Sequence, residues 1–235
     1  MAKPRSSVAE ILKTLEAQYG VQSPGWPTDP YQFLIWWHCG YPASDERCAK
    51  GWQALTTQIG IEPELLLAAT PSKLAAALKS GGMVPELRAM RVKEIAARVK
   101  DEFNGELRSA LVGTISEARK TLKSFPNIAD PGADRILLFA GIAPVAAVPS
   151  NCPHVMVRVL QGRERENYGV TYRETQKAIE DGVPKTASPR QQAYLLLKKH
   201  GQEICKRTNP KCDSCVLSRS CAYFAGNYRG RSARP

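Results

Sequence analysis

Four cysteines near the end of the chain have a spacing suited to metal chemistry. Cys205, Cys212, Cys215 and Cys221 form the pattern C-x6-C-x2-C-x5-C. Each iron of a 4Fe–4S cluster takes one protein sulfur, so four thiolates gathered by a loop can hold such a cluster. We therefore predict a metal-binding loop at these four residues.

Two other uses of four cysteines compete with the cluster. The thiolates of a structural zinc site usually come as two close pairs, whereas only Cys212 and Cys215 are close together here. Disulfide bonds need an oxidising compartment, and residues 1–5, MAKPR, open the chain without the apolar stretch of a signal peptide. The pattern favours the cluster, and we expect the protein to be cytoplasmic, or nucleoid-associated if it is bacterial. The other three cysteines are interpreted as buried free thiols: Cys39, Cys48 and Cys152.

The charge of the chain predicts an anionic partner. Its 235 residues include 33 Lys+Arg against 22 Asp+Glu, which gives a net charge of +11. An excess of this size on a small protein favours nucleic acid as the partner. Basic residues gather around the cysteines and in the tail: Lys198, Lys199, Lys206, Arg207, Lys211, Arg229, Arg231 and Arg234. No apolar run approaches the roughly eighteen residues of a membrane span, so we expect no membrane association.

Nearly every periodic segment has helical spacing. Val8, Ile11 and Leu15 fall on one face of a segment that Ser6 or Ser7 can cap, and Thr70 and Thr114 mark two further helix starts. The connector at residues 23–27, SPGWP, is a candidate boundary between the first helix and the body. We predict helices over residues 7–18, 31–37, 49–59, 62–69, 71–78, 84–103, 115–123, 133–139, 155–160, 174–181 and 188–204.

The cysteine spacing, close behind Gly201 and a helical run, resembles the cluster loop of the endonuclease III family of DNA glycosylases. The resemblance implies an all-α, two-lobed helix-hairpin-helix glycosylase fold with a C-terminal iron–sulfur cluster loop. Residues 30–140 would form a six-helix lobe with the hairpin near 120–140, and residues 1–29 with 141–225 a second helical lobe that carries the loop. Residues 226–235 would be a disordered basic tail. We expect a monomer that binds double-stranded DNA.

A second resemblance to this family lies at residues 125–139, FPNIADPGADRILLF. The family's hairpin points backbone N–H groups at a DNA phosphate, and its two turn glycines are replaced here by Asn127 and Ala129. Asn tolerates left-handed backbone better than most residues. Beyond the turn, Ile136 and Leu137 form an apolar face with Asp134 and Arg135 opposite. An ordinary helix corner without a ligand stays an alternative. The predicted DNA-binding residues are Asn127, Ile128, Ala129, Pro131, Gly132 and Ala133.

The family's two catalytic groups are missing from their expected positions. The resemblance places Pro131 where bifunctional members have a lysine that forms a Schiff base, and proline has no amine for that reaction. It places Pro149 where an aspartate normally follows a short apolar stretch, with residues 152–154 as an insertion before the next helix. Another carboxylate, or an amide that orients a water, could supply electrostatic help, although each is also an ordinary capping or solvated residue. The candidates are Asp130, Asp134, Asp45 and Asn151.

Two further residues fit the handling of a flipped base. Tyr41 could stack on a base and Met83 could act as an apolar wedge, unless they are simply a core residue and a gap filler. His38 and His154 are interpreted as core histidines rather than acid/base groups. The leading hypothesis is a monofunctional glycosylase that excises a damaged or modified base without Schiff-base lyase activity. The alternative is a catalytically inactive protein that binds DNA lesions or DNA structures.

Overall fold

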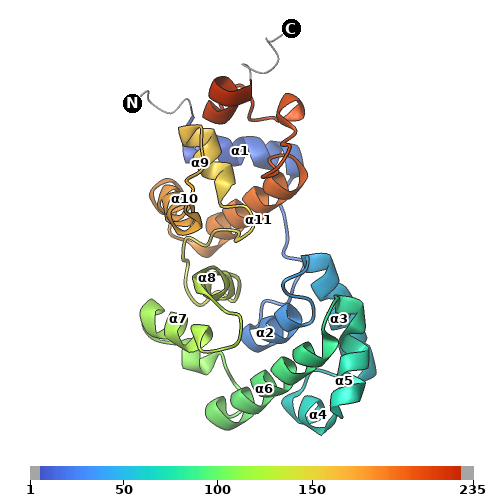
Figure 1. Cartoon of the computed structure of the whole chain (residues 1–235). Helices are drawn as coiled ribbons and strands as arrows, with labels where there is room; N and C mark the ends of the chain where they lie inside the picture. The colour runs from blue at the N-terminus through green and yellow to red at the C-terminus, as the bar shows by residue number, and fades with distance from the viewer. Residues whose placement is uncertain (1–5, 229–235) are drawn as a thin grey trace. The chain divides into compact units, whose positions relative to one another are not determined.

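The computed structural model describes residues 6–228, and all regular elements in this part of the chain are helices. The all-α prediction is therefore confirmed. The described chain divides into two compact units. One unit joins the residues up to Ser23 to those from Ala143 onward, and the other is Pro24–Ile142. The first helix of the chain therefore folds with the last ones, as the colours of Figure 1 show for α1 and α11.

The continuous unit consists of short helices with Gly- or Pro-containing connections. α6 packs against α2, α4 and α5, while α2 lies between α3 and α8 and contacts both (Figure 1). These contacts place α7 and α8, which pack on each other, at one side of the unit. Its helices are α2 (Pro30–His38), α3 (Asp45–Gln58), α4 (Pro63–Ala68), α5 (Pro71–Leu78), η1 (Lys79–Gly81), α6 (Pro85–Phe103), η2 (Ser109–Leu111), α7 (Ile115–Lys123) and α8 (Asp130–Phe139).

Both polar residues in the middle of α8 are buried, which corrects the expectation that Asp134 and Arg135 face away from the packed side. Only 4% of Arg135 is exposed. Its guanidinium carbon lies 3.7 Å from the ring centroid of Trp26, and its Nη2 donates to Asp45 at 3.1 Å. The planar guanidinium can stack on an aromatic face while it binds a carboxylate. α8 is therefore packed around most of its circumference.

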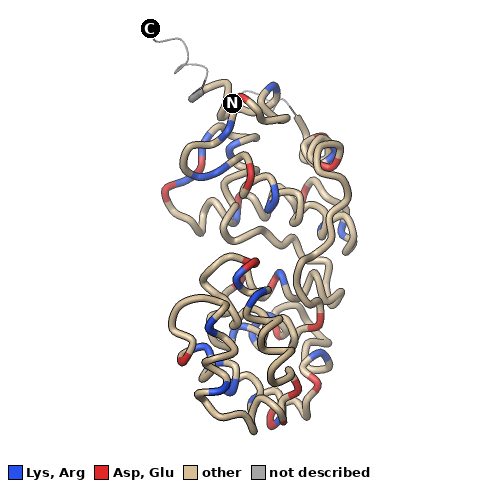
Figure 2. The backbone as a smooth tube through the Cα atoms, turned by 90° about the vertical axis from the view of Figure 1, so that its right-hand side faces the viewer, with Lys and Arg blue, Asp and Glu red and all other residues tan. Residues whose placement is uncertain are grey.

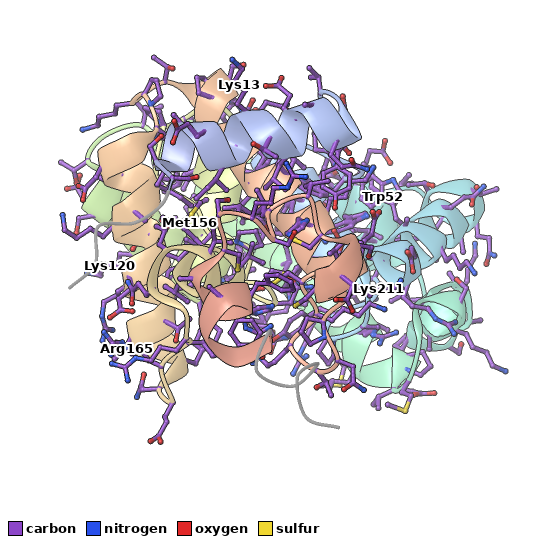
Figure 3. All side chains as sticks on the ribbon, turned by 90° about the horizontal axis from the view of Figure 1, so that it is seen from above. Lys13, Trp52, Lys120, Met156, Arg165 and Lys211 are labelled. Carbon is purple, nitrogen blue, oxygen red and sulfur yellow. The ribbon has the colours of Figure 1, made fainter. Side chains whose placement is uncertain are left out.

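The discontinuous unit surrounds a single apolar core. Ile11 and Leu15 of α1 pack there with Val155, Met156 and other buried side chains. In Figure 3, Met156 lies among the elements of this unit while Lys13, on the outer face of α1, points away from them. Its helices are α1 (Val8–Tyr19), α9 (His154–Gln161), α10 (Tyr168–Gly182), α11 (Ala187–Glu203), η3 (Cys212–Ser214) and η4 (Phe224–Tyr228).

Local signals set most helix starts. The side chains of Ser7 and Glu10 form a capping box on α1, those of Thr114 and Glu117 form one on α7, and Thr70 caps α5. Three starts were predicted three or more residues too late, because α3 begins at Asp45, α8 at Asp130 and α10 at Tyr168 rather than at residues 49, 133 and 174.

Element η4 includes residues 226–228, which the sequence analysis placed in a disordered tail. The rest of that tail, with Arg229, Arg231 and Arg234, lies outside the described residues. None of the described helices has the length and apolar character that crossing a bilayer requires.

Candidate nucleic-acid interface and cysteine loop

The turn between α7 and α8, residues 124–129, is called the hairpin below. Asn127 has a φ of 54°, so it takes the left-handed conformation that the missing glycine would have supplied. Ile128 is buried beneath the turn, and Ala129 is the N-cap of α8. The sequence therefore preserves the hairpin with Asn127 in place of a turn glycine.

The end of the hairpin and the first turn of α8 present several unpaired backbone N–H groups. The amide of Ala133 donates to the carbonyl of Ala129 at 3.0 Å. Among the described residues, no acceptor is found for the amides of Ala129, Asp130 and Gly132, and Pro131 carries no N–H. These amides lie at the positive end of α8, where an anion is favoured by both hydrogen bonding and the helix dipole.

Two ion pairs connect α7 to α8 next to the hairpin. Lys123 Nζ lies 2.6 Å from Oδ1 of Asp130, and both side chains are substantially exposed. Arg119 Nε donates to Oδ1 of Asp134 at 2.6 Å, and that carboxylate is buried. The inner pair fastens the two helices together, while the outer pair stays accessible to solvent.

The four cysteines of the predicted metal loop face one cavity. Cys205, Cys212, Cys215 and Cys221 line it together with Arg158 and His200. Within residues 6–228, no three His, Cys, Asp or Glu side chains are arranged closely enough to hold a single metal ion. A zinc ion needs every ligand atom about 2.0–2.3 Å from one point, whereas each sulfur around a 4Fe–4S cluster binds a different iron. Four sulfurs around one cavity suit the donor set of such a cluster.

The segment from Cys205 to Cys221, called the cysteine loop below, is anchored by α9. Arg158 donates to the carbonyls of Lys206 at 2.9 Å and Arg207 at 3.0 Å. Its Nη2 also donates to Glu164 at 2.7 Å. His154 Nε2 lies 2.7 Å from the carbonyl oxygen of Cys205. The loop therefore has a fixed path at its first cysteine.

The end of α11, which leads into the cysteine loop, packs closely against Cys152. A Cβ on Gly201 would lie 2.5 Å from the sulfur of Cys152, so only glycine lets α11 approach this thiol. Cys39, Cys48 and Cys152 are all buried free thiols, as predicted. Burial also raises the pKa of the Cys152 thiol to about 11, which makes it unreactive at neutral pH.

Burial dominates the electrostatics of the cysteine loop in the metal-free chain. It raises the pKa of Cys205 to about 12, against the opposing influence of the Arg158 guanidinium, and that of Cys215 to about 11. It lowers the pKa of His200 to about 4, so this imidazole is neutral at physiological pH. The loop thus holds protonated thiols beside a neutral histidine until a metal displaces the protons.

Comparison with known proteins identifies the fold. The chain superposes on a solved non-covalent endonuclease III–DNA complex with a TM-score of 0.76, at 18% identity and over 100% of both chains. It also superposes on a thermostable thymine-DNA glycosylase with a TM-score of 0.70, at 19% identity, over 93% of this chain and 96% of that one.

The chain has the endonuclease III fold.

One curated relative also matches in sequence. The thymine/uracil-DNA glycosylase of Pyrobaculum aerophilum is 25% identical over 162 residues, which are 69% of this chain. The match spans 66% of that relative's length, just under two thirds. No protein-family model matches the chain.

The two positions expected to carry catalytic groups hold prolines. Pro131 occupies the second position of α8, where a proline fits the first helical turn. Pro149 belongs to an irregular segment that precedes α9. α9 begins at His154, so the expected insertion at residues 152–154 contributes its last residue to the helix. Neither proline can accept a proton or form an imine.

The alternative acid/base candidates differ in their exposure and in their ion-pair partners. Asp134 is paired inside the α7–α8 interface, and Asp45 binds the buried Arg135. Asp130 is exposed at the start of α8, and Asn151 is exposed in the other unit. Their catalytic roles stay predictions, and exposure favours Asp130 and Asn151. His38 and His154 are both buried, which agrees with their interpretation as core residues.

The two base-handling candidates have distinct surroundings. Tyr41 is stacked on Trp37 with ring centroids 4.5 Å apart, so one of its faces is already covered. Met83 is 85% exposed and therefore fills no gap in the core. Val84 follows it with a φ of 54°, a costly conformation for a β-branched residue. Their binding roles also stay predictions.

Sequence reasoning missed several residues near these sites. Arg119 and Lys120 precede the hairpin on α7, and their spacing to Lys123 could have indicated a basic helix face. Arg158 and His200 contact the cysteine loop, but the contact of Arg158 gave no local signal because its partners in that loop lie more than forty positions later in the chain. In Figure 2, Lys and Arg (blue) are spread over both units, with Asp and Glu (red) among them.

Proposed function

We propose that this protein is a monofunctional DNA glycosylase. The hairpin would hold a phosphate of double-stranded DNA, a damaged or modified base would rotate out of the stack, and water would replace the base at the sugar carbon. The observation that supports this most is the set of unpaired amides at the start of α8, on the endonuclease III fold. The named activity of the Pyrobaculum aerophilum relative points the same way.

The absence of an amine at Pro131 supports excision without strand cleavage. A Schiff base requires a primary amine at the sugar carbon, and the resemblance assigns that position to Pro131. Lys123, an amine close to the start of α8, is paired with Asp130. We therefore propose base release without lyase chemistry.

We also propose that the cysteine loop holds a 4Fe–4S cluster. The support is the spacing of the four cysteines and the single cavity that they line. When bound, such a cluster would cross-link the loop and stabilise its path. Arg158 and His154 would hold the loop backbone in position for it.

The decisive experiment is an excision assay on a panel of duplexes, each with one damaged, modified or mispaired base. A monofunctional glycosylase leaves abasic sites, so strand breaks should appear only after hot alkali. Borohydride should trap no protein–DNA adduct, and a trapped adduct would contradict the absence of lyase activity. Duplex binding with no alkali-sensitive site on any substrate would favour the catalytically inactive DNA-binding alternative.

The hairpin contact can be tested by removing one N–H group. Asp130→Pro removes the amide and the carboxylate, whereas Asp130→Ala removes the carboxylate alone. Proline is tolerated at this first helical position, and no internal hydrogen bond is lost. A charge-assisted hydrogen bond contributes about 1.5 kcal/mol, so Asp130→Pro should bind duplex DNA roughly tenfold more weakly than Asp130→Ala. Equal affinities would exclude this amide as a phosphate ligand.

A further inference from the structure

A polar hollow lies beside the hairpin in the continuous unit. It has a volume of about 430 Å³ and contains no apolar side chain in its lining. Its residues come from α7, from the first position of the hairpin and from the start of α8. They are Ser116, Arg119, Lys120, Lys123, Ser124 and Asp130.

The lining has an excess of positive charge. Three of its side chains are cationic and one is a carboxylate. Arg119 is held by Asp134, which lies outside the lining, and Lys123 is held by Asp130. Lys120 has no ion pair with any described residue, and it is exposed on α7. The hollow therefore combines fixed cations with one cation that is free to bind a ligand.

We propose that this hollow binds a second backbone phosphate of the duplex, next to the one held by the hairpin amides. This inference rests on the proposed function, since it assigns a further contact of the same DNA. Arg and Lys donors together with serine hydroxyls are the groups that commonly bind phosphate oxygens. Ser124 is the first residue of the hairpin and Asp130 follows its last residue, so the two sites are continuous along the chain.

Asp130 serves as an internal anion in the DNA-free protein. Its carboxylate lies 2.6 Å from Lys123 Nζ, where it neutralises a cation that a phosphate would otherwise contact. Both partners are more than 40% exposed, so water and salt weaken the pair. A phosphate with its own contacts to Lys120 can therefore displace the carboxylate from Lys123.

The test compares four neutralising variants in the full-length protein: Lys120→Gln, Lys123→Gln, Asp130→Asn and the control Lys73→Gln. Lys73 is an exposed lysine on α5, a helix that packs against α3 and α6 rather than α7 or α8. The affinity for an undamaged duplex is measured at several salt concentrations. Arg119 is left unchanged because it supports the buried Asp134.

The expected results separate this site from general electrostatics. Lys120→Gln and Lys123→Gln should each weaken binding about three- to tenfold and reduce the slope of log K against log salt by about one. Lys73→Gln should change neither quantity. Asp130→Asn should strengthen binding by a few-fold, because it removes the competing carboxylate and keeps the backbone amide.

Two outcomes would overturn the proposal, and they differ from failure of the proposed function. If Lys120→Gln keeps the wild-type salt slope, or changes it no more than Lys73→Gln does, the hollow contacts no DNA phosphate. If inorganic phosphate protects Lys120 from amine modification while duplex DNA does not, the hollow binds a free anion instead. If the wild-type protein does not bind duplexes even at low salt, the proposed function itself is wrong.

Discussion

The phenol oxygen of Tyr19 lies 2.9 Å from Nδ1 of His200, and Nε2 of the same ring lies 3.6 Å from the sulfur of Cys215. Burial raises the pKa of Tyr19 to about 12, so its hydroxyl stays protonated. In the tautomer with the ring proton on Nε2, this hydroxyl donates to Nδ1 and the ring N–H points at the sulfur, which is the arrangement that a deprotonated, metal-binding Cys215 favours. Tyr19 on α1 supports this tautomer of a histidine that touches the cysteine loop.

Replacement of Tyr19 by Phe should change the reduction potential of a cluster bound at the cysteine loop. Without the hydroxyl, His200 is no longer held as an N–H donor to Cys215, and hydrogen bonds to the sulfurs favour the reduced state. A loss of about 1 kcal/mol corresponds to a shift of roughly 40 mV toward lower potential for one electron. Protein-film voltammetry measures this shift.

Tyr168→Phe is the matched control for Tyr19, because the hydroxyl of Tyr168 donates to the carbonyl of Ser150 rather than to the cysteine loop. The control should keep the wild-type potential. If a Tyr19→Phe protein has full iron content and an unchanged potential, the hydrogen bond from Tyr19 to His200 does not influence the reduction potential through Cys215. Colourless wild-type protein would instead refute the cluster.

Asp134 is expected to be important for stability rather than for chemistry. Its buried carboxylate accepts from Arg119, so Asp134→Ala should lower the free energy of unfolding by about 2 kcal/mol. Asp181→Ala, in an exposed pair with Lys177, should cost less than about 0.5 kcal/mol. Urea denaturation measures both. A loss of base release in folded Asp134→Ala protein, at unchanged stability, would restore Asp134 as a catalytic candidate.

Arg158 should be required for an ordered cysteine loop. Arg158→Met keeps an apolar stem but removes donors to two carbonyls and to Glu164, at a cost of roughly 3 kcal/mol in stability. Bound iron per chain should fall in the same variant. Arg165→Met, which breaks a more exposed pair with Glu174, should retain wild-type iron content. Equal iron content and equal unfolding midpoints in the two variants would contradict this anchoring role.

The elements were predictable from sequence where their causes are local. The Thr114–Glu117 capping box and the apolar face of α1 depend on residues within one or two turns, and both are present. The left-handed Asn127 was also predictable, because the turn demands that conformation and few residues tolerate it. The start of α3 was also indicated locally, by an N-cap serine, Ser44, and two acidic residues in the first turn, Asp45 and Glu46. A prediction from hydrophobic periodicity alone does not use these residues.

The contacts that define the sites were not predictable in the same way. Arg135 in a helix suggests a solvent-facing residue, and its burial is explained by contacts with residues distant in sequence, such as Trp26 and Asp45. Arg158 reaches carbonyls 48 and 49 positions later in the chain. Periodicity describes one helix at a time, so it cannot show which partners the tertiary fold brings to a buried charge.

His38 should make the stability of the continuous unit depend on pH. Burial lowers its pKa to about 4, with Arg91 acting in the same direction and the carbonyl of Leu34 opposing it. The unfolded histidine titrates near 6.5, so its stabilising contribution is complete above that pH and is lost as the pH falls from about 6.5 to 4. Between pH 7 and pH 5 the wild type should therefore lose about 2 kcal/mol more than His38→Phe, whose ring does not titrate. Urea unfolding of both proteins at the two pH values measures this difference. If the two proteins lose the same free energy over this interval, His38 does not contribute to the acid sensitivity of the fold.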